Sequence, residues 1–345
     1  MSQPPVAVAA PFAPPPPGRP PARSRGILVH VGWEAVLLVL VLLTAAVVAA
    51  TGTLFRGASP WNTLGATGLL ATGFALSLRT ATPNLAVGAI SVLAGASYAK
   101  LVQEDVTGVL AGVVAVLVAL VIGVVLGLVA GLTSAPAWAV TLGGMAMAQA
   151  IVFALLDGQS IIVGATPSGS GRAILWTLVF VAISIGGGVL WQVPGIRAAL
   201  GANRVQDDPV RFRGAKLMGA LAGLGGSSLL AGLSGVVLVT YLGAASPAGD
   251  NVVIAVGAAL LGGVSAFGGR GGVTGTVLAT ALLVFANNGL VQSDAPRWVT
   301  FYLPAALAIL VGVVVSRLIE AISGPYTAVP GLAPPPAPGW VGPAR

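Results

Sequence analysis

The side chains that carry most enzyme and metal chemistry are scarce in this sequence. The 345 residues contain no cysteine and a single histidine, His30. Without thiolates, and with only one imidazole, the chain can build neither a disulfide, nor a catalytic thiol, nor a histidine-based metal site. We therefore expect no metal ion and no other cofactor.

The polar side chains within or beside the long apolar stretches are instead uncharged. They are four amides and one phenol: Asn84, Gln149, Asn287, Asn288 and Tyr241. Lipid does not tolerate an unsatisfied amide, so each amide should face protein or a water-filled path. Each one can be read as an interhelical hydrogen bond, but together the five also suit a path for a neutral polyhydroxylated solute, or for a nucleoside.

Helices that cross a membrane must position these residues. The chain is 56% hydrophobic and only 7% charged, whereas soluble proteins have about 25% charged residues. A span needs about 20 mostly apolar residues. The stretches that meet this need, or come close to it, are 31–53, 61–79, 84–103, 108–131, 138–156, 172–193, 214–240, 251–264, 272–290 and 298–318. We predict an all-α polytopic bundle of about ten transmembrane helices, with eight or nine as alternatives; glycines between 262 and 272 allow a broken or re-entrant pair.

Proline-rich segments flank the predicted membrane domain. Residues 1–26 contain nine prolines and three arginines and predict a disordered tail, 27–320 form the membrane domain, and 321–345 form a second proline-rich tail. With both tails in the cytoplasm, twelve of the sixteen Lys and Arg lie on the inner side, as the positive-inside rule requires. Because these residues lie in short gaps between apolar runs rather than in a basic stripe, the net charge of +7 does not indicate nucleic-acid binding.

The chain shows no obvious energy source of its own. The carboxylates and lysines of the predicted spans are Glu34, Lys100 and Lys216, each near a span end, which argues against a proton-driven carrier. A nucleotide-binding P-loop needs Gly-Lys followed by Ser or Thr, but both lysines follow alanine. We therefore expect neither a nucleotide-binding motif nor an enzyme, and energy from a separate subunit.

Four short motifs occur in a recognisable order and spacing. They are Gly-Ala-Asn at 201–203, Ser-Pro-Ala-Gly at 246–249, the glycine-rich run 262–271 and Asn-Asn-Gly at 287–289. In this order the chain resembles the permease subunits of ABC transporters of the monosaccharide class, the ribose and xylose type, within a superfamily that includes branched-chain amino acid permeases. The chain departs from that family at Asn84 and Ala86, where an acid and a hydroxyl are usual.

The resemblance implies a permease of the bacterial inner (cytoplasmic) membrane that imports a small neutral solute, a monosaccharide, by ATP-driven alternating access. The implied partners are cytoplasmic ABC ATPase subunits, a second permease subunit in a homo- or heterodimer, an extracytoplasmic solute-binding protein and membrane lipid. The segment implied to couple to the ATPase comprises Gly201, Ala202, Asn203, Arg204, Asp207 and Asp208, although its charges also fit a topology signal alone. A nucleoside or branched-chain amino acid permease, or a channel or facilitator independent of an ATPase, remains the alternative.

Overall fold

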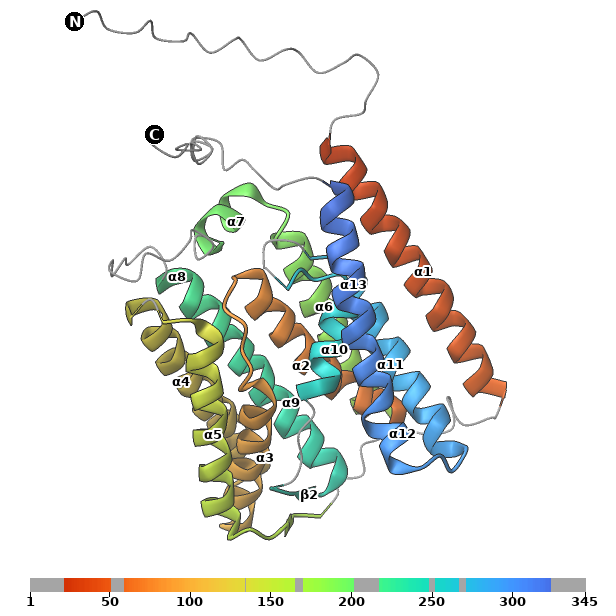
Figure 1. Cartoon of the computed structure of the whole chain (residues 1–345). Helices are drawn as coiled ribbons and strands as arrows, with labels where there is room; N and C mark the ends of the chain where they lie inside the picture. Colours follow the sequence, from red (N-terminus) through yellow and green to blue (C-terminus); the bar gives the residue numbers. More distant parts are fainter. Residues whose placement is uncertain are drawn as a thin grey trace, which may run out of the picture.

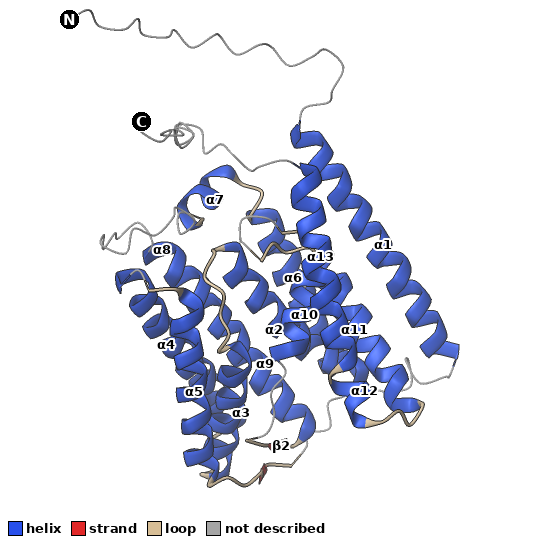
Figure 2. Cartoon of the chain, in the orientation of Figure 1, coloured by secondary structure: helices blue, strands red, loops and turns tan. Residues whose placement is uncertain are grey.

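The computed structural model describes residues 22–50, 59–133, 135–164, 170–201, 217–247, 252–266 and 271–323. Within these ranges the chain is almost entirely helical (Figure 2). The exception is an antiparallel pair of two-residue strands, β1 (Ile161–Ile162) and β2 (Ala244–Ala245). The predicted all-α polytopic class is confirmed.

Each of the ten predicted stretches corresponds to a helix or a pair of helices. The helices are α1 (Ala22–Ala50), α2 (Ser59–Arg79), α3 (Val87–Gln103), α4 (Gly108–Thr133), α5 (Ala137–Leu156), α6 (Ser170–Leu190), α7 (Pro194–Leu200), α8 (Leu217–Ala220), α9 (Gly226–Leu242), α10 (Val252–Leu261), α11 (Gly275–Gln292), α12 (Arg297–Phe301) and α13 (Leu303–Ser323). A π-helical turn, Leu221–Gly225, joins α8 to α9. Helix α1 begins inside the segment predicted as the first tail; most of both tails lies outside the described residues.

Seven of the helical segments in the described ranges are long and apolar enough to cross a membrane. They are α1, α4, α5, α6, α8 with α9, α11, and α12 with α13. Two of the remaining predicted spans, α3 and α10, are short, with 17 and 10 residues. The third, α2, is long enough but carries many polar residues.

Helix α2 lies at the centre of the bundle (Figure 1). It packs against α9, α6, α10 and α11, and 17 of its 21 residues are buried. Glycines permit these close contacts: a Cβ atom added at Gly68 would meet the ring of Phe180 in α6, and one at Gly73 would lie 2.8 Å from the carbonyl oxygen of Ser227. Polar side chains on α2 therefore face protein rather than lipid.

The outer helices expose large apolar side chains, as expected for a surface in contact with lipid. Val31 and Leu42 of α1, Val109 of α4, Leu178 of α6 and Leu310 of α13 are all more than half exposed. The helices that carry these residues lie around α2, α3, α9 and α10 (Figure 1).

Two groups of four helices have the same pattern of contacts. In one group α3 packs against α4 and α5, and also against α9; in the other α10 packs against α11 and α13, and also against α2. Helices α2 and α9 pack against each other where the groups meet. The start of α1 and the end of α13 lie at the same end of the bundle, with α7, while the β1–β2 pair lies at the opposite end (Figure 1).

Candidate functional site

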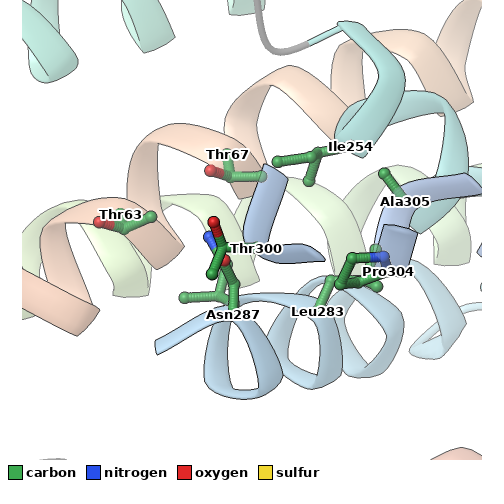
Figure 3. Close-up of a pocket in the computed structure, with 9 residues that line it drawn as sticks. Thr63, Thr67, Ile254, Leu283, Asn287, Thr300, Pro304 and Ala305 are labelled. Atoms are coloured by element: carbon green, nitrogen blue, oxygen red, sulfur yellow. The ribbon is translucent and has the colours of Figure 1, made fainter. Parts of the chain in front are cut away.

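A small pocket with a mainly apolar lining lies among α2, α10, α11, α12 and α13 (Figure 3). Its volume is about 20 Å³, enough for about one water molecule. The residues that line it are Thr63, Thr67, Ile254, Leu283, Val284, Asn287, Thr300, Pro304 and Ala305. None of the nine is ionisable, and four carry a hydroxyl or an amide, so the pocket offers hydrogen bonds without charge.

Several buried amide atoms on α2 and α11 have no hydrogen-bond partner among the described residues. They are Oδ1 of Asn287, Nδ2 of Asn288, and Nδ2 of Asn62, which precedes Thr63 on α2. A buried polar group left without a partner costs about 1–3 kcal/mol. Water or a solute that reached these atoms would therefore gain hydrogen bonds that the protein itself does not supply.

Asn84 has a different environment from the pocket residues. It is wholly buried, and its Nδ2 atom donates to Oγ of Ser227 at 2.6 Å and to Oγ of Ser228 at 3.3 Å. Its Oδ1 atom accepts from the backbone N–H of Ala86 at 3.1 Å. The residue thus joins the unwound segment before α3 to α9, and the geometry favours the interhelical hydrogen bond over the solute path.

The segment that contains Asn84 runs between α2 and α3 without regular hydrogen bonds. Backbone groups there are paired by side chains: Oγ of Ser77 accepts from the N–H of Asn84, and Oγ1 of Thr141 accepts from the N–H of Leu85. The hydroxyl of Thr141 also contacts the carbonyl oxygen of Pro83 at 3.1 Å. Irregular backbone is tolerated at membrane depth only where protein satisfies its polar groups in this way.

The other two predicted path residues, Gln149 and Tyr241, do not line the pocket. Gln149 is half-buried on α5, which Figure 1 places across the bundle from α11, and its Oε1 atom has no partner among the described residues. The hydroxyl of Tyr241 forms a hydrogen bond with Oγ of Ser59, which ties the end of α9 to the start of α2. The structure therefore brings Asn287 and Asn288 together on α11 but does not gather all five residues at one site.

The predicted coupling segment is described only at its first residue. The backbone N–H of Gly201 donates to the carbonyl oxygen of Arg197 at 2.9 Å and ends α7, a helix without buried residues. Ala202, Asn203, Arg204, Asp207 and Asp208 lie outside the described residues. Their contact with an ATPase stays a prediction.

Sequence reasoning missed the threonines of the pocket and a polar cluster around Glu34. Thr63 and Thr67 are four residues apart on α2, so a helical period would have placed both hydroxyls on one face.

Among the described residues, no group of three or more His, Asp or Glu is arranged to hold a metal ion.

No protein-family model matches the sequence, and no solved structure matches it. The ribose import permease protein RbsC of Bacillus subtilis is 33% identical over 242 residues, which cover 65% of this chain and 73% of that protein. RbsC of Escherichia coli K12 is 25% identical over 244 residues, covering 64% and 73%. The xylose transport system permease protein XylH of the same strain is 30% identical over 86 residues, covering 24% and 22%. Together with the seven described helical segments that could cross a membrane, this similarity indicates a multi-pass protein of the bacterial cell membrane. The chain belongs to the family of ABC-importer permeases that includes the ribose permeases.

Proposed function

We propose that this chain is the membrane-spanning subunit of an importer that carries a neutral monosaccharide by ATP-driven alternating access. The observation that carries the proposal is the alignment with the ribose import permease of Bacillus subtilis, which extends over 65% of the chain. The sequence has no Gly-Lys-Ser/Thr motif for nucleotide binding. ATP hydrolysis is therefore assigned to separate ABC ATPase subunits on the cytoplasmic face.

The chemistry of the pocket supports a neutral solute with many hydroxyl groups. Hydroxyls of Thr63 and Thr67 and the amide of Asn287 can both donate and accept hydrogen bonds, as sugar hydroxyls do. A carboxylate or ammonium group would enter without an opposite charge among the lining residues, at a large desolvation cost. A sugar is therefore favoured over an amino acid, which carries both charges. A nucleoside is also neutral, so its exclusion requires a measurement.

The remaining partners follow from the same proposal. A second permease subunit completes the pore, an extracytoplasmic binding protein delivers the solute, and the ATPase drives the conformational cycle. We assign the ATPase contact to Gly201–Asp208, the inner segment that follows α7. The pocket, of about 20 Å³, is too small for a sugar in the described state, so a solute requires rearrangement of α2 or α11.

Competitive uptake tests the substrate class. The full transporter, with its ATPase and binding protein, is reconstituted in proteoliposomes, and uptake of radiolabelled D-ribose is measured with excess adenosine or leucine. We expect ATP-dependent ribose uptake that neither competitor lowers by more than about twofold. Strong uptake of adenosine or leucine instead of ribose would overturn the monosaccharide assignment. A matched preparation with a hydrolysis-deficient ATPase gives the background.

A further inference from the structure

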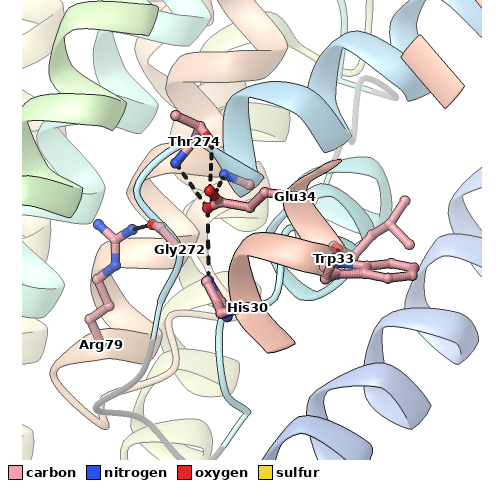
Figure 4. Close-up of polar contacts among 8 residues, drawn as sticks. His30, Trp33, Glu34, Arg79, Gly272 and Thr274 are labelled. Atoms are coloured by element: carbon pink, nitrogen blue, oxygen red, sulfur yellow. Dashed lines mark hydrogen bonds and ion pairs between the residues drawn. The ribbon is translucent and has the colours of Figure 1, made fainter. Parts of the chain in front are cut away.

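One turn of α1 holds two helix ends that lie on either side of the α10–α11 connection (Figure 4). The indole Nε1 of Trp33 donates to the carbonyl oxygen of Leu261, the last residue of α10, at 2.7 Å. The carboxylate of the next residue, Glu34, accepts from the backbone N–H groups of Thr274 at 3.1 Å and Gly275 at 3.0 Å. It also accepts from the hydroxyl of Thr274 at 2.8 Å. A single side of α1 therefore fixes both the end of α10 and the start of α11.

Glu34 acts as an N-terminal cap supplied by another helix. The first N–H groups of a helix have no partner inside the helix, and its dipole favours negative charge there. Thr274, the residue at the cap position of α11, forms no side-chain cap of its own. The Glu34 side chain is only 17% exposed, and hydrogen bonds to a charged group are roughly twice as strong as neutral ones.

A second charged side chain holds the same segment from α2. Nη2 of Arg79 donates to the carbonyl oxygen of Gly272 at 2.9 Å, and Arg79 is 3% exposed. A Cβ atom at Gly271 would lie 2.6 Å from Nε of Arg79, and one at Gly272 would meet Glu34 and His30, so a larger residue at either position would displace these side chains. Nε2 of His30 lies 3.8 Å from Oε1 of Glu34. Residues 271–275 are thus held on one side by an anion and on the other by a cation.

The opposite face of α1 has none of these polar groups. Val31, Val36 and Leu42 are exposed and apolar, so this side of α1 suits contact with lipid. Ionisable side chains within membrane helices are costly and mark functional positions. Glu34 thus lies on the inner face of a helix whose other face suits lipid.

We propose that Glu34 is a positioning residue for transport, which sets the start of α11 and thereby the position of the amides at its other end. Asn287 follows Gly275 by twelve residues, or about 18 Å along a helix that rises 1.5 Å per residue. Because an α-helix is stiff over this distance, a displacement at Glu34 is transmitted to Asn287 and the pocket. This inference rests on the proposed function, since transport is the activity that it positions.

Four single variants separate a positioning role of Glu34 from a role of its charge and from a general loss of stability. Glu34→Ala removes the cap, whereas Glu34→Gln keeps an amide oxygen for the two backbone N–H groups and loses the charge. Trp33→Phe keeps the ring and removes the indole N–H. Glu104→Ala is the matched control, because this carboxylate is 67% exposed and pairs only with Lys100, at 3.8 Å, in the described residues.

Two measurements are made on each assembled transporter after size-exclusion chromatography confirms that it is intact. The first is hydrogen exchange of the amides in 272–278; the second is the maximal rate and KM of D-ribose uptake, together with the ATPase rate. We expect Glu34→Ala to speed exchange and lower the maximal rate at least tenfold, with KM within twofold of wild type. Glu34→Gln should keep at least half of the wild-type rate, and Trp33→Phe should fall between the two.

The outcomes distinguish this inference from the proposed function. Faster exchange in Glu34→Ala with a wild-type uptake rate would overturn the positioning role and leave a purely structural cap. Equal loss of uptake in Glu34→Gln and Glu34→Ala would overturn it in favour of a role for the charge. If the wild-type transporter fails to take up ribose, the substrate assignment fails, while exchange and ATPase rates still test the inference.

Discussion

Helices α2 and α4 have similar lengths, but the less apolar helix, α2, is the more deeply buried of the two. In α2, 17 of 21 residues are buried, including Asn62, Thr67, Thr72 and Arg79. In α4, only 8 of 26 residues are buried, although α4 is far more apolar. Among the described residues, α4 is one of the seven helical segments that are long and apolar enough to cross a membrane, whereas α2 is not.

The difference shows what apolar composition measures in a membrane protein. Lipid selects large apolar side chains, so composition reports contact with lipid rather than burial. The buried face of α4 consists mainly of small residues at intervals of four, from Ala111, Ala115 and Ala119 to Gly123, Gly127 and Gly131. Within lipid the hydrophobic effect does not drive helices together, and small residues instead allow close packing between them.

Overpacking the small face of α4 should have the largest effect. A Cβ atom at Gly123 would lie 2.5 Å from Cβ of Ser228 and from the carbonyl oxygen of Leu224. We expect Gly123→Leu to lower the free energy of unfolding in mixed micelles by about 3 kcal/mol, at the upper end for overpacking. The control is Gly143→Leu, because a Cβ atom there meets nothing within 4 Å. Equal losses in both variants would show that α4 does not depend on this contact.

Removing a buried amide beside α2 should have the next largest effect. Asn84→Ala deletes the bonds to Ser227 and Ala86, and we expect a loss of about 1–2 kcal/mol in the free energy of unfolding. A double-mutant cycle with Ser227→Ala checks the contact, and the expected coupling energy is about 0.6 kcal/mol or more. Additive effects would mean that the two side chains do not interact.

A hydroxyl on α2 that lines the pocket should affect transport rather than stability. Thr67→Val keeps the shape and removes one hydrogen-bonding group. Since such a bond contributes about 0.5–1.5 kcal/mol, we expect ribose uptake to fall about two- to tenfold with unchanged unfolding. Thr133→Val, at the exposed end of α4, is the control. Loss of uptake in the control but not in Thr67→Val would contradict the pocket assignment.

A change on the exposed face of α4 should have the smallest effect. Val121 is 60% exposed, so we expect Val121→Ala to change the free energy of unfolding of the isolated chain by less than about 0.5 kcal/mol. A loss above about 1 kcal/mol would show that this face packs against protein, and the contrast with α2 would fail.

Most of the fold could be predicted from the sequence, because membrane spans leave a strong length and composition signal. All ten predicted stretches contain helix, including the polar stretch 61–79 that became α2. The helix ends were harder to place: α1 begins at Ala22, before the predicted start at 31, and includes arginines that the prediction gave to the tail.

The site was less predictable, since its contacts join residues far apart in the sequence. Asn287 was recognisable as an amide in an apolar helix, but threonine gives no such signal, because its hydroxyl can bond to its own helix. Thr141 does this with the carbonyl oxygen of Ala137. Glu34 was predicted to lie near a span end, but its partners are 240 and 241 residues away, and no local pattern indicates them.

The energy source tests the central claim most directly. Proteoliposomes that contain this chain with its ATPase and binding protein are loaded with ATP, and D-ribose uptake is measured with and without proton and sodium ionophores. We predict uptake that requires ATP hydrolysis and that ionophores lower by less than about twofold. Uptake by the chain without the ATPase, whether driven by an ion gradient or by the solute gradient alone, would contradict the account and make the protein a carrier or facilitator.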